Sequence, residues 1–357
     1  MFNAKLSQVK VNTNNQVNQV KVNTNNQVNI LKDETKEGRI RPWKKKKESN
    51  LKVASSYLDA SIKNKALRVY QCAKVLQFQV TPQGKKLAHA WFCKVRLCPM
   101  CNWRRSIKIA NQNREIILRA NKEEKLKWLF LTLTTGETVE GKDLKKRIDH
   151  SMEAFNRFMK YRRIQHIIRG YFRGLEVTKN KNKYHPHFHV LLAVKPSYFN
   201  NLYITQKDWA IFWKKAMKSS SDIIVDVRTV KPNKKHSILT ETKIQAFEGA
   251  LQEVSKYPVK DIEILKGNRQ ENAVTVYTLD NALSHKRLIG YGGILKEIRK
   301  KLQLEDCEDE HVNLIHLDEK CNDIIASEIE MITAYWHYGL KEYIVKNNNI
   351  YDKESLV

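Results

Sequence analysis

The sequence predicts an α+β domain preceded by a cysteine-rich segment. Runs of apolar and β-branched residues are typical of sheet strands, and four are found at 128–134, 171–178, 187–194 and 223–230. Helical periodicity occurs between and after them, at 143–162, 206–217 and 241–257. The strands at 171–178 and 187–194 are separated only by a short polar loop, so we expect them to be neighbours. This mixture of strands and helices indicates an α+β sheet domain.

The composition indicates a nucleic-acid partner. The 357 residues, enough for about two domains plus tails, include 65 Lys and Arg against 38 Asp and Glu, a net charge of +27. Residues 302–357 contain 13 acidic and 4 basic residues, so their net charge is −9 and that of residues 1–301 is +36. We therefore expect the polyanion to bind upstream of Leu302. No apolar run approaches the roughly 18 residues of a spanning helix and no signal peptide opens the chain, so we expect no membrane association and a cytoplasmic protein.

Residues 1–50 are predicted to be a disordered basic tail. The polar unit QVKVNTNNQVN occurs at 8–18 and again at 19–29, and two copies of so short a unit cannot build a core. A lysine run at 44–47 extends the tail, either as a non-specific DNA arm or as a solvated linker. Folded structure is expected to begin near Leu51.

The segment 51–125 contains a candidate structural zinc site. Strands are expected within 68–80 and a helix after Cys101. Four cysteines occur here with the pattern C-x20-C-x4-C-x2-C, and four thiolates suffice for a closed tetrahedral zinc site. Ordinary buried cysteines are the alternative. Such a site would hold a basic stretch in shape for contact with phosphates. The proposed zinc ligands are Cys72, Cys93, Cys98 and Cys101, and the proposed DNA contacts there are Arg96, Arg104 and Arg105.

The sequence HPHFHVLL supplies a candidate divalent-metal site. His187 and His189 are two residues apart, so both imidazoles project from one face of a strand. Glu176 on the neighbouring strand is placed to add an oxygen ligand, and His185 could substitute or assist. Strand histidines are often structural, so the pair by itself leaves both interpretations open.

A candidate nucleophile lies at the end of the helix predicted at 241–257. Glu253 and Tyr257 are four residues apart, so both side chains could reach one phosphate, and Pro258 disfavours further helix. Ionising a phenol of pKa about 10 at pH 7 costs roughly 4 kcal/mol, which nearby Lys256 or Lys260 and a bound metal could lower. An ordinary core or surface tyrosine is the alternative.

In combination these motifs resemble the HUH endonucleases, specifically the single-tyrosine replication initiators of rolling-circle plasmids from Gram-positive bacteria. Three motifs match in order, FLTLTTG at 130–136, HPHFHVLL at 185–192 and EVSKYPVKD at 253–261. The stretches FCKVRLCPMCNWRRS at 92–106 and RLIGYGGILKEIRKKL at 287–302 are similar to that family's flanks, so the resemblance covers about 69–302.

The resemblance implies an antiparallel central sheet with flanking helices, in a catalytic domain over 126–301. It places the histidines on a central strand and the tyrosine on a flanking helix. It implies that His187 and His189, with Glu176 as a third ligand, bind Mg or Mn. Tyr257 would nick one strand of plasmid origin DNA, leaving a 5′-phosphotyrosine link and a free 3′-hydroxyl, and Glu253 would direct water in the terminating cleavage.

The expected partners are the plasmid origin and a host DNA polymerase in the bacterial cytoplasm. A host helicase is also expected to separate the strands, because the chain has no ATP-binding G-x-x-x-x-G-K-[ST] loop of its own. A homodimer at the origin is left open. A relaxase or transposase of the same superfamily, and a non-enzymatic zinc-containing DNA-binding regulator, are the alternative functions. The acidic segment 302–357 is expected to be helical, with one or two helices within 324–343, and to modulate origin binding or oligomerisation.

Overall fold

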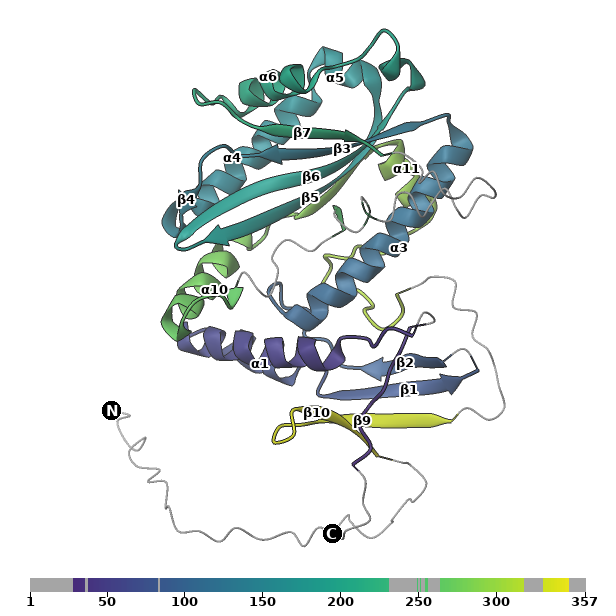
Figure 1. Cartoon of the computed structure of the whole chain (residues 1–357), viewed down its shortest axis with the longest axis vertical. Coiled ribbons are helices and arrows are strands. Elements are labelled where there is room, and N and C mark those ends of the chain that lie inside the picture. The colour runs from purple at the N-terminus through teal and green to yellow at the C-terminus, as the bar shows by residue number, and fades with distance from the viewer. Residues whose placement is uncertain are drawn as a thin grey trace, which may run out of the picture.

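The computed structural model describes residues 28–35, 38–82, 84–230, 249, 251, 254, 255, 264–317 and 330–346. Figure 1 shows the helices and strands of these residues. In chain order they are α1 (Trp43–Asp59), α2 (Lys63–Gln71), β1 (Val75–Thr81), β2 (Gly84–Ala90), α3 (Pro99–Glu123), β3 (Lys127–Thr134), β4 (Val139–Glu140), α4 (Gly141–Met159), α5 (Arg162–Ile167), β5 (Ile168–Asn180), β6 (Lys183–Val194), a 3-10 turn (Pro196–Phe199), α6 (Gln206–Met217), β7 (Val225–Thr229), α10 (Arg269–Leu283), β8 (Ile289–Gly293), α11 (Ile294–Lys301), β9 (Met331–His337) and β10 (Glu342–Lys346).

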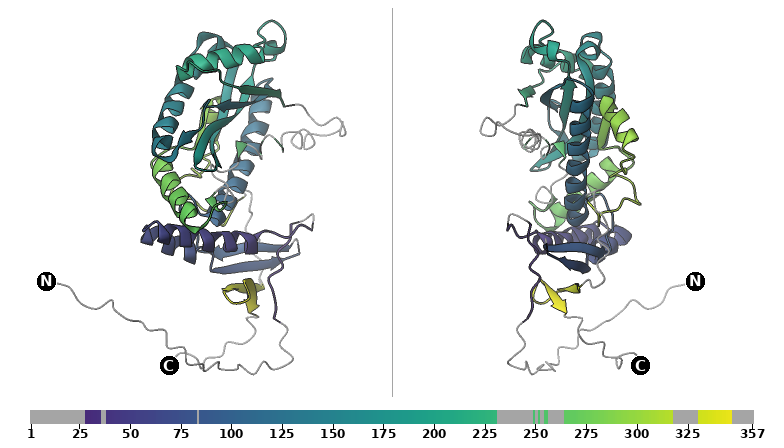
Figure 2. Two further views of the ribbon diagram at one scale, coloured as in Figure 1. Left: turned by 60° about the vertical axis from the view of Figure 1, so that its left-hand side comes forward. Right: turned by 90° about the vertical axis from the view of Figure 1, so that its right-hand side faces the viewer.

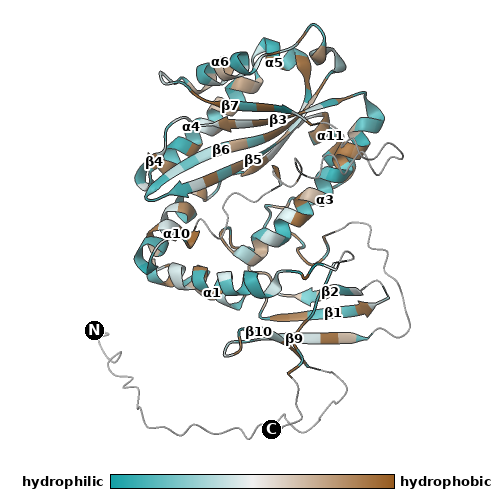
Figure 3. Ribbon diagram, viewed as in Figure 1, coloured by the Kyte–Doolittle hydropathy of each residue, from teal (hydrophilic) through white to brown (hydrophobic). Residues whose placement is uncertain are grey.

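The larger sheet has six strands, and all its pairings are antiparallel. Its order is β7-β3-β6-β5-β8, and the short strand β4 also pairs with β6. The predicted α+β fold with an antiparallel central sheet is therefore confirmed, and the histidine strand β6 lies at its centre. Figure 3 shows β6 as hydrophilic at the end near β4 and hydrophobic further along, so its polar residues gather at one end of the sheet.

One face of this sheet is the main hydrophobic core. The ring of Phe188 on β6 lies 5.4 Å from that of Phe155 on α4, and Phe158 on α4 lies 5.6 Å from Trp213 on α6. The Trp213 Nε1 donates to the Thr134 carbonyl at 2.6 Å, which ties α6 to β3. Since successive strand residues alternate between faces, packing these rings against α4 and α6 turns the neighbouring histidines to the opposite face.

The smaller sheet joins the two ends of the described chain. Its order is β10-β9-β1-β2, again antiparallel, and residue 30 forms a further bridge with Ile344 on β10. Figures 1 and 2 show this sheet at one end of the molecule, with α1 between it and the larger sheet. The prediction of helix over 324–343 is wrong for residues 331–343. There residues 331–337 pair with both β1 and β10 as strand β9, and Ile332, Thr333, Ala334 and Trp336 are buried.

The lysine run 44–47 lies in α1, so helix begins eight residues before the expected start of folded structure at Leu51. Lys47 is fully buried, and its Nζ donates to the carbonyls of Tyr70 and Cys72 at 2.7 Å each. Neither a free DNA arm nor a solvated linker describes this lysine. The repeats at 8–29 lie outside the described residues except for Val28 and Asn29.

No helix among the residues that the structure describes is long and apolar enough to span a bilayer.

Candidate active site and metal centres

Glu176, His187 and His189 form one cluster on the face of the larger sheet opposite α4 and α6. Glu176 on β5 is the direct cross-strand partner of His187 on β6, and His189 follows two residues later. One Glu176 oxygen, Oε2, lies 3.0 Å from His189 Nε2 and 3.7 Å from His187 Nε2. All three residues are at most 8% exposed. We call this group the His–Glu cluster.

The His–Glu cluster could hold a metal ion, because two imidazole nitrogens and a carboxylate oxygen lie within 4.8 Å of one another. This donor set fits a divalent cation that accepts both nitrogen and oxygen ligands. His185 lies at the rim, its ring 5.7 Å from that of His187. Burial and the neighbouring His187 lower the pKa of His185 below its usual range, so this side chain is neutral at pH 7.

The Nδ1 atoms of the two histidines also face oxygen atoms. His187 Nδ1 lies 3.2 Å from the His185 carbonyl oxygen, and His189 Nδ1 lies 3.3 Å from the Thr132 hydroxyl on β3. The ring of Phe130, two residues before Thr132, stacks against that of His189 at 5.5 Å. Both imidazoles are therefore held in place from β3 and β6.

The chain segment that precedes Tyr257 lies against the same face of the sheet. Gly174 on β5 is the cross-strand partner of His189, and a Cβ atom on Gly174 would lie only 2.8 Å from the Val254 carbonyl oxygen. Glycine is required here because any side chain would meet this backbone atom. The Val254 backbone thus approaches the sheet at Gly174, which lies directly opposite His189 of the His–Glu cluster.

A polar network on α3 fixes this approach. The Nδ2 of Asn113 on α3 donates to the Ser255 hydroxyl at 3.2 Å, and the Tyr291 hydroxyl on β8 donates to Asn113 Oδ1 at 2.9 Å. Asn113 and Ser255 are each 2% exposed, and Leu251 and Val254 are buried as well. Glu253, Lys256, Tyr257 and Lys260 themselves lie outside the described residues.

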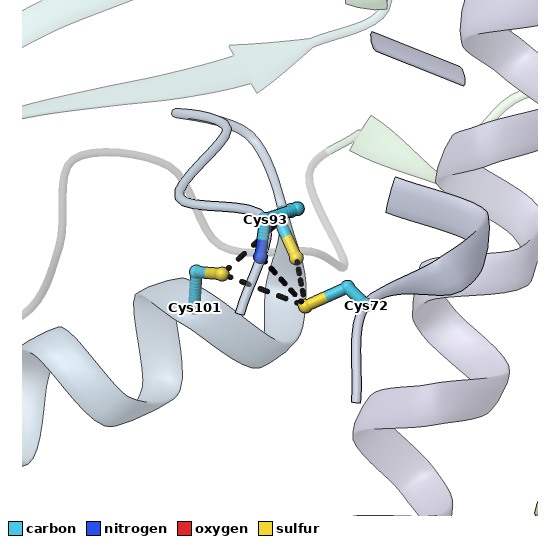
Figure 4. Close-up of side chains that lie close together, drawn as sticks. Cys72, Cys93 and Cys101 are labelled. Carbon is cyan, nitrogen blue, oxygen red and sulfur yellow. Dashed lines mark hydrogen bonds between the residues drawn. The ribbon is translucent and has the colours of Figure 1, made fainter. Parts of the chain in front are cut away.

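The four cysteines expected to bind zinc meet at a second site, which we call the four-cysteine cluster. Cys72 follows α2, Cys93 follows β2, Cys98 precedes α3 and Cys101 lies in its first turn. The distance between Sγ atoms is 3.6 Å for Cys72 and Cys101, 3.7 Å for Cys93 and Cys101, and 3.6 Å for Cys72 and Cys98. Figure 4 shows the side chains of Cys72, Cys93 and Cys101 pointing toward one another.

The spacing and surroundings of the four-cysteine cluster fit a metal ion. Four sulfurs arranged tetrahedrally at about 2.3 Å from an ion are about 3.8 Å apart. Burial acts to raise the pKa of the Cys101 thiol, but hydrogen bonds from the other three cysteines outweigh it and lower this pKa well below its ordinary value. The backbone N–H of Lys94 also donates to Cys101 Sγ at 3.2 Å. Burial raises the pKa of the Cys72 and Cys93 thiols well above their ordinary value. The geometry could therefore hold a metal ion, whose binding would deprotonate these thiols.

Two of the basic residues next to this cluster, Arg104 and Arg105, point into the protein, which argues against the expected DNA contacts there, whereas Arg96 is partly exposed and its DNA contact stays a prediction. Arg104 is 5% exposed and donates to the carbonyls of Leu314 and Ile315 at 2.9 and 2.8 Å. Arg105 is 2% exposed and donates to the Lys94 carbonyl at 2.7 Å. Arg96 donates to the Lys286 carbonyl at 2.9 Å. The acceptors lie after α11 for Arg104, beside the cysteines for Arg105 and just before β8 for Arg96, so three separate segments cover these guanidinium groups.

Four residues that shape the site were not identified from the sequence, namely Thr132, Gly174, Asn113 and Ser255. Thr132 lies between the core residues Leu131 and Leu133 on β3, and Gly174 lies on β5. Asn113 lies on the buried face of α3 beside Ile109, Ile116 and Ile117, so its polar side chain between isoleucines one turn away is a signal that could have indicated it, since buried polar groups require a partner. Their partners depend on tertiary contacts that no local pattern shows.

The chain is similar to a family of known proteins. A family model described as "Replication protein" matches residues 84–344, which extends beyond the expected end at 302. A "Protein rep" from Bacillus amyloliquefaciens is 45% identical over 332 residues, covering 88% of this chain and 96% of that protein. Others from Lentilactobacillus hilgardii and Streptococcus pneumoniae are 38% and 37% identical, each covering 88% of this chain and 98% and 95% of the relatives. No solved structure matches the chain.

Proposed function

The chain belongs to the replication protein family, and from that membership we propose that it initiates rolling-circle replication of a plasmid by nicking one strand of the origin. The observation that carries the proposal is the close approach of Val254 to Gly174, beside the His–Glu cluster. Val254 lies on the face of the sheet that bears the His–Glu cluster, and the proposed nucleophile, Tyr257, follows it by three residues in the sequence.

The proposed reaction is a transesterification. The Tyr257 phenol oxygen forms a bond to the scissile phosphorus, and the bond from phosphorus to the 3′ oxygen breaks. The phenolic proton is lost and the leaving oxygen gains one, so the products are a 5′-phosphotyrosine link and a free 3′-hydroxyl. Lys256 and Lys260 would favour the phenolate by their positive charge. In the terminating cleavage Glu253 would accept a proton from water that attacks the next phosphate.

Each metal site has a proposed occupant. In the His–Glu cluster Glu176, His187 and His189 would hold Mg²⁺ or Mn²⁺, which would polarise the scissile phosphate. In the four-cysteine cluster the thiolates would hold a structural Zn²⁺. We expect about one zinc per purified chain by elemental analysis. This zinc should be lost in the double variant Cys98→Ser/Cys101→Ser and retained in His187→Ala/His189→Ala, whereas zinc that follows the histidines would contradict the assignment.

The nicking reaction is tested with a labelled single-stranded oligonucleotide carrying the plasmid origin, incubated with Mn²⁺ and separated on a denaturing gel. We expect wild type to give a covalent protein–DNA band and Tyr257→Phe to give none. Tyr277→Phe is the matched control, since Tyr277 is an exposed tyrosine on α10 and should leave the band unchanged.

Two other outcomes favour the alternative functions. Origin binding by wild type without cutting would favour a zinc-containing DNA-binding regulator. Tyr257-dependent cutting of a transfer-origin or transposon-end sequence, with no cutting at the replication origin, would favour a relaxase or transposase. The partners proposed for the initiator are the origin DNA, the host helicase and polymerase, and a second copy of the chain at the origin.

A further inference from the structure

Each histidine of the His–Glu cluster has one ring nitrogen toward Glu176 and the other toward a fixed oxygen. The Nε2 atoms of His187 and His189 face Glu176 Oε2. The Nδ1 of His187 faces a backbone carbonyl, that of His185, whereas the Nδ1 of His189 faces a side chain, the Thr132 hydroxyl. Only the second of these contacts can be removed by substitution.

A hydroxyl suits the position beside His189 in both states of the site. Without a metal, an Nε2–H on His189 can donate to Glu176, and the Thr132 hydroxyl can then donate to Nδ1. When Nε2 binds a metal, the ring proton moves to Nδ1, and the same hydroxyl can accept it. A threonine oxygen therefore satisfies Nδ1 in either tautomer, which neither an N–H group nor a carbonyl can do.

We propose that Thr132 is a positioning residue for the metal ion, acting through the orientation and tautomer of His189. The inference rests on the proposed divalent-metal site. Partners of metal-bound imidazoles fix the ring orientation, and their loss typically weakens metal binding by about 10–100-fold. The cross-strand pairing of Thr132 with His189 and the stacking of Phe130 on the same ring hold the two groups in register.

The neighbouring Thr134 provides a matched control. It lies on the same strand and the same face, opposite His187, but its hydroxyl donates to the Ile224 carbonyl at 2.9 Å. Replacing either threonine by valine removes one hydroxyl, keeps the branched shape and suits a strand. The two variants differ in whether the missing oxygen faced a metal-ligating ring.

The experiment measures Mn²⁺ binding to the full-length, zinc-loaded, DNA-free protein by calorimetry. Thr132→Val should weaken binding by about 10–100-fold, Thr132→Ser should bind within about threefold of wild type, and Thr134→Val should match wild type. Thermal unfolding without Mn²⁺ should be similar for all four proteins. If Thr132→Val does not fold, Thr132→Ala is compared with Thr132→Ser in the same way.

Equal Mn²⁺ affinity for wild type and Thr132→Val would overturn the inference, as would equal weakening by Thr132→Val and Thr134→Val. Absence of Mn²⁺ binding that depends on His189 in wild type would overturn it together with the metal site. Failure of the nicking proposal would be distinguishable from failure of this inference. If wild type gives no covalent band but Thr132→Val still loses Mn²⁺ affinity, Thr132 positions a metal that serves another reaction.

Discussion

Glu176, His187 and His189 converge because a strand places every second residue on one face. Glu176 and His187 are direct cross-strand partners, so the ligand set needs only two adjacent strands. The identity of the third ligand candidate therefore follows from register, and His185, two residues before His187, lies at the rim.

Glu253→Gln is expected to separate the two cleavages. Glutamine keeps the size of the side chain but cannot accept a proton from water, so hydrolysis should slow by about 10²–10⁴-fold while the tyrosine still forms its phosphodiester. On a single-stranded substrate with two nick sites, the covalent complex should accumulate. A variant that releases the second product at the wild-type rate would contradict the assigned role.

Cys307 is expected to contribute stability that disappears at alkaline pH. Burial raises the pKa of this thiol from its usual range to about 12, and the thiol contacts Gln112 Oε1 at 3.2 Å. Because the folded pKa lies above the unfolded value of about 8.5, the contribution is present below pH 8.5 and is lost as pH rises to 12.

The measurement is the free energy of unfolding of wild type and Cys307→Ala from pH 8 to 11. The advantage of wild type should shrink as pH rises over this range. An advantage that is constant or grows with pH would show that the thiol is not held neutral.

Helix α3 connects the four-cysteine cluster with Ser255, which lies next to the residue that approaches the His–Glu cluster. Its first turn carries Cys101, and three turns further on Asn113 binds Ser255 next to the tyrosine segment. At a rise of 1.5 Å per residue these positions are about 18 Å apart along the axis. The four-cysteine cluster therefore lies at the start of the helix whose middle binds Ser255.

Gly174→Ala is expected to displace this segment. The added Cβ would meet the Val254 carbonyl at 2.8 Å, and backbone cannot move aside as a side chain end can. We expect nicking to fall by about 10-fold or more, since an error of 1 Å in placement can cost 10²-fold in rate. Mn²⁺ affinity should be retained.

Gly249→Ala is the control for this prediction, because no atom lies within 4 Å of its added Cβ. Alanine at this helical position should be neutral or slightly stabilising. Equal activity of the two variants in the covalent-band assay would show that the approach of Val254 to the sheet does not position Tyr257.

At the scale of the whole molecule, the late strands β9 and β10 join the early strands β1 and β2 in one sheet. β9 lies between β1 and β10 in the smaller sheet, and the carboxylate of Glu308 accepts from the backbone N–H groups of Leu288 and Ile289 at 2.9 and 3.2 Å. Residues beyond 302 therefore complete the smaller sheet and contact the larger sheet at β8, although their net charge is opposite to that of residues 1–301. The division of the chain at residues 50, 125 and 301 stays a prediction.

Deleting residues 302–357 is expected to unfold the smaller sheet. The deletion removes the buried side chains of Ile332, Trp336 and Tyr343, each worth about 1.5–3 kcal/mol, from a protein whose total stability is of the order of 5–15 kcal/mol. Such a protein should be insoluble or should melt at least 10 °C lower. A chain that ends after Lys346 keeps β9 and β10 and should melt like wild type.

A soluble deletion variant with the wild-type melting temperature and changed origin binding would instead support the modulating role first expected for this segment. Loss of the fold would leave that role to be tested by surface substitutions within 302–317, compared with wild type at equal stability.

The sequence by itself determined the strands β3, β5, β6 and β7, the shared face of the two histidines and the candidate ligands, because a period of two residues and short cysteine spacings are local properties. The central position of the histidine strand was implied by the motif resemblance, and the sheet order confirms it. Only the tertiary structure decided that Arg104 and Arg105 serve backbone carbonyls, that 331–346 is sheet, and that Gly174, Asn113 and Thr132 shape the site. These outcomes depend on which segments, far apart in sequence, cover a side chain, and burial then decides whether a charged or polar group faces DNA or protein.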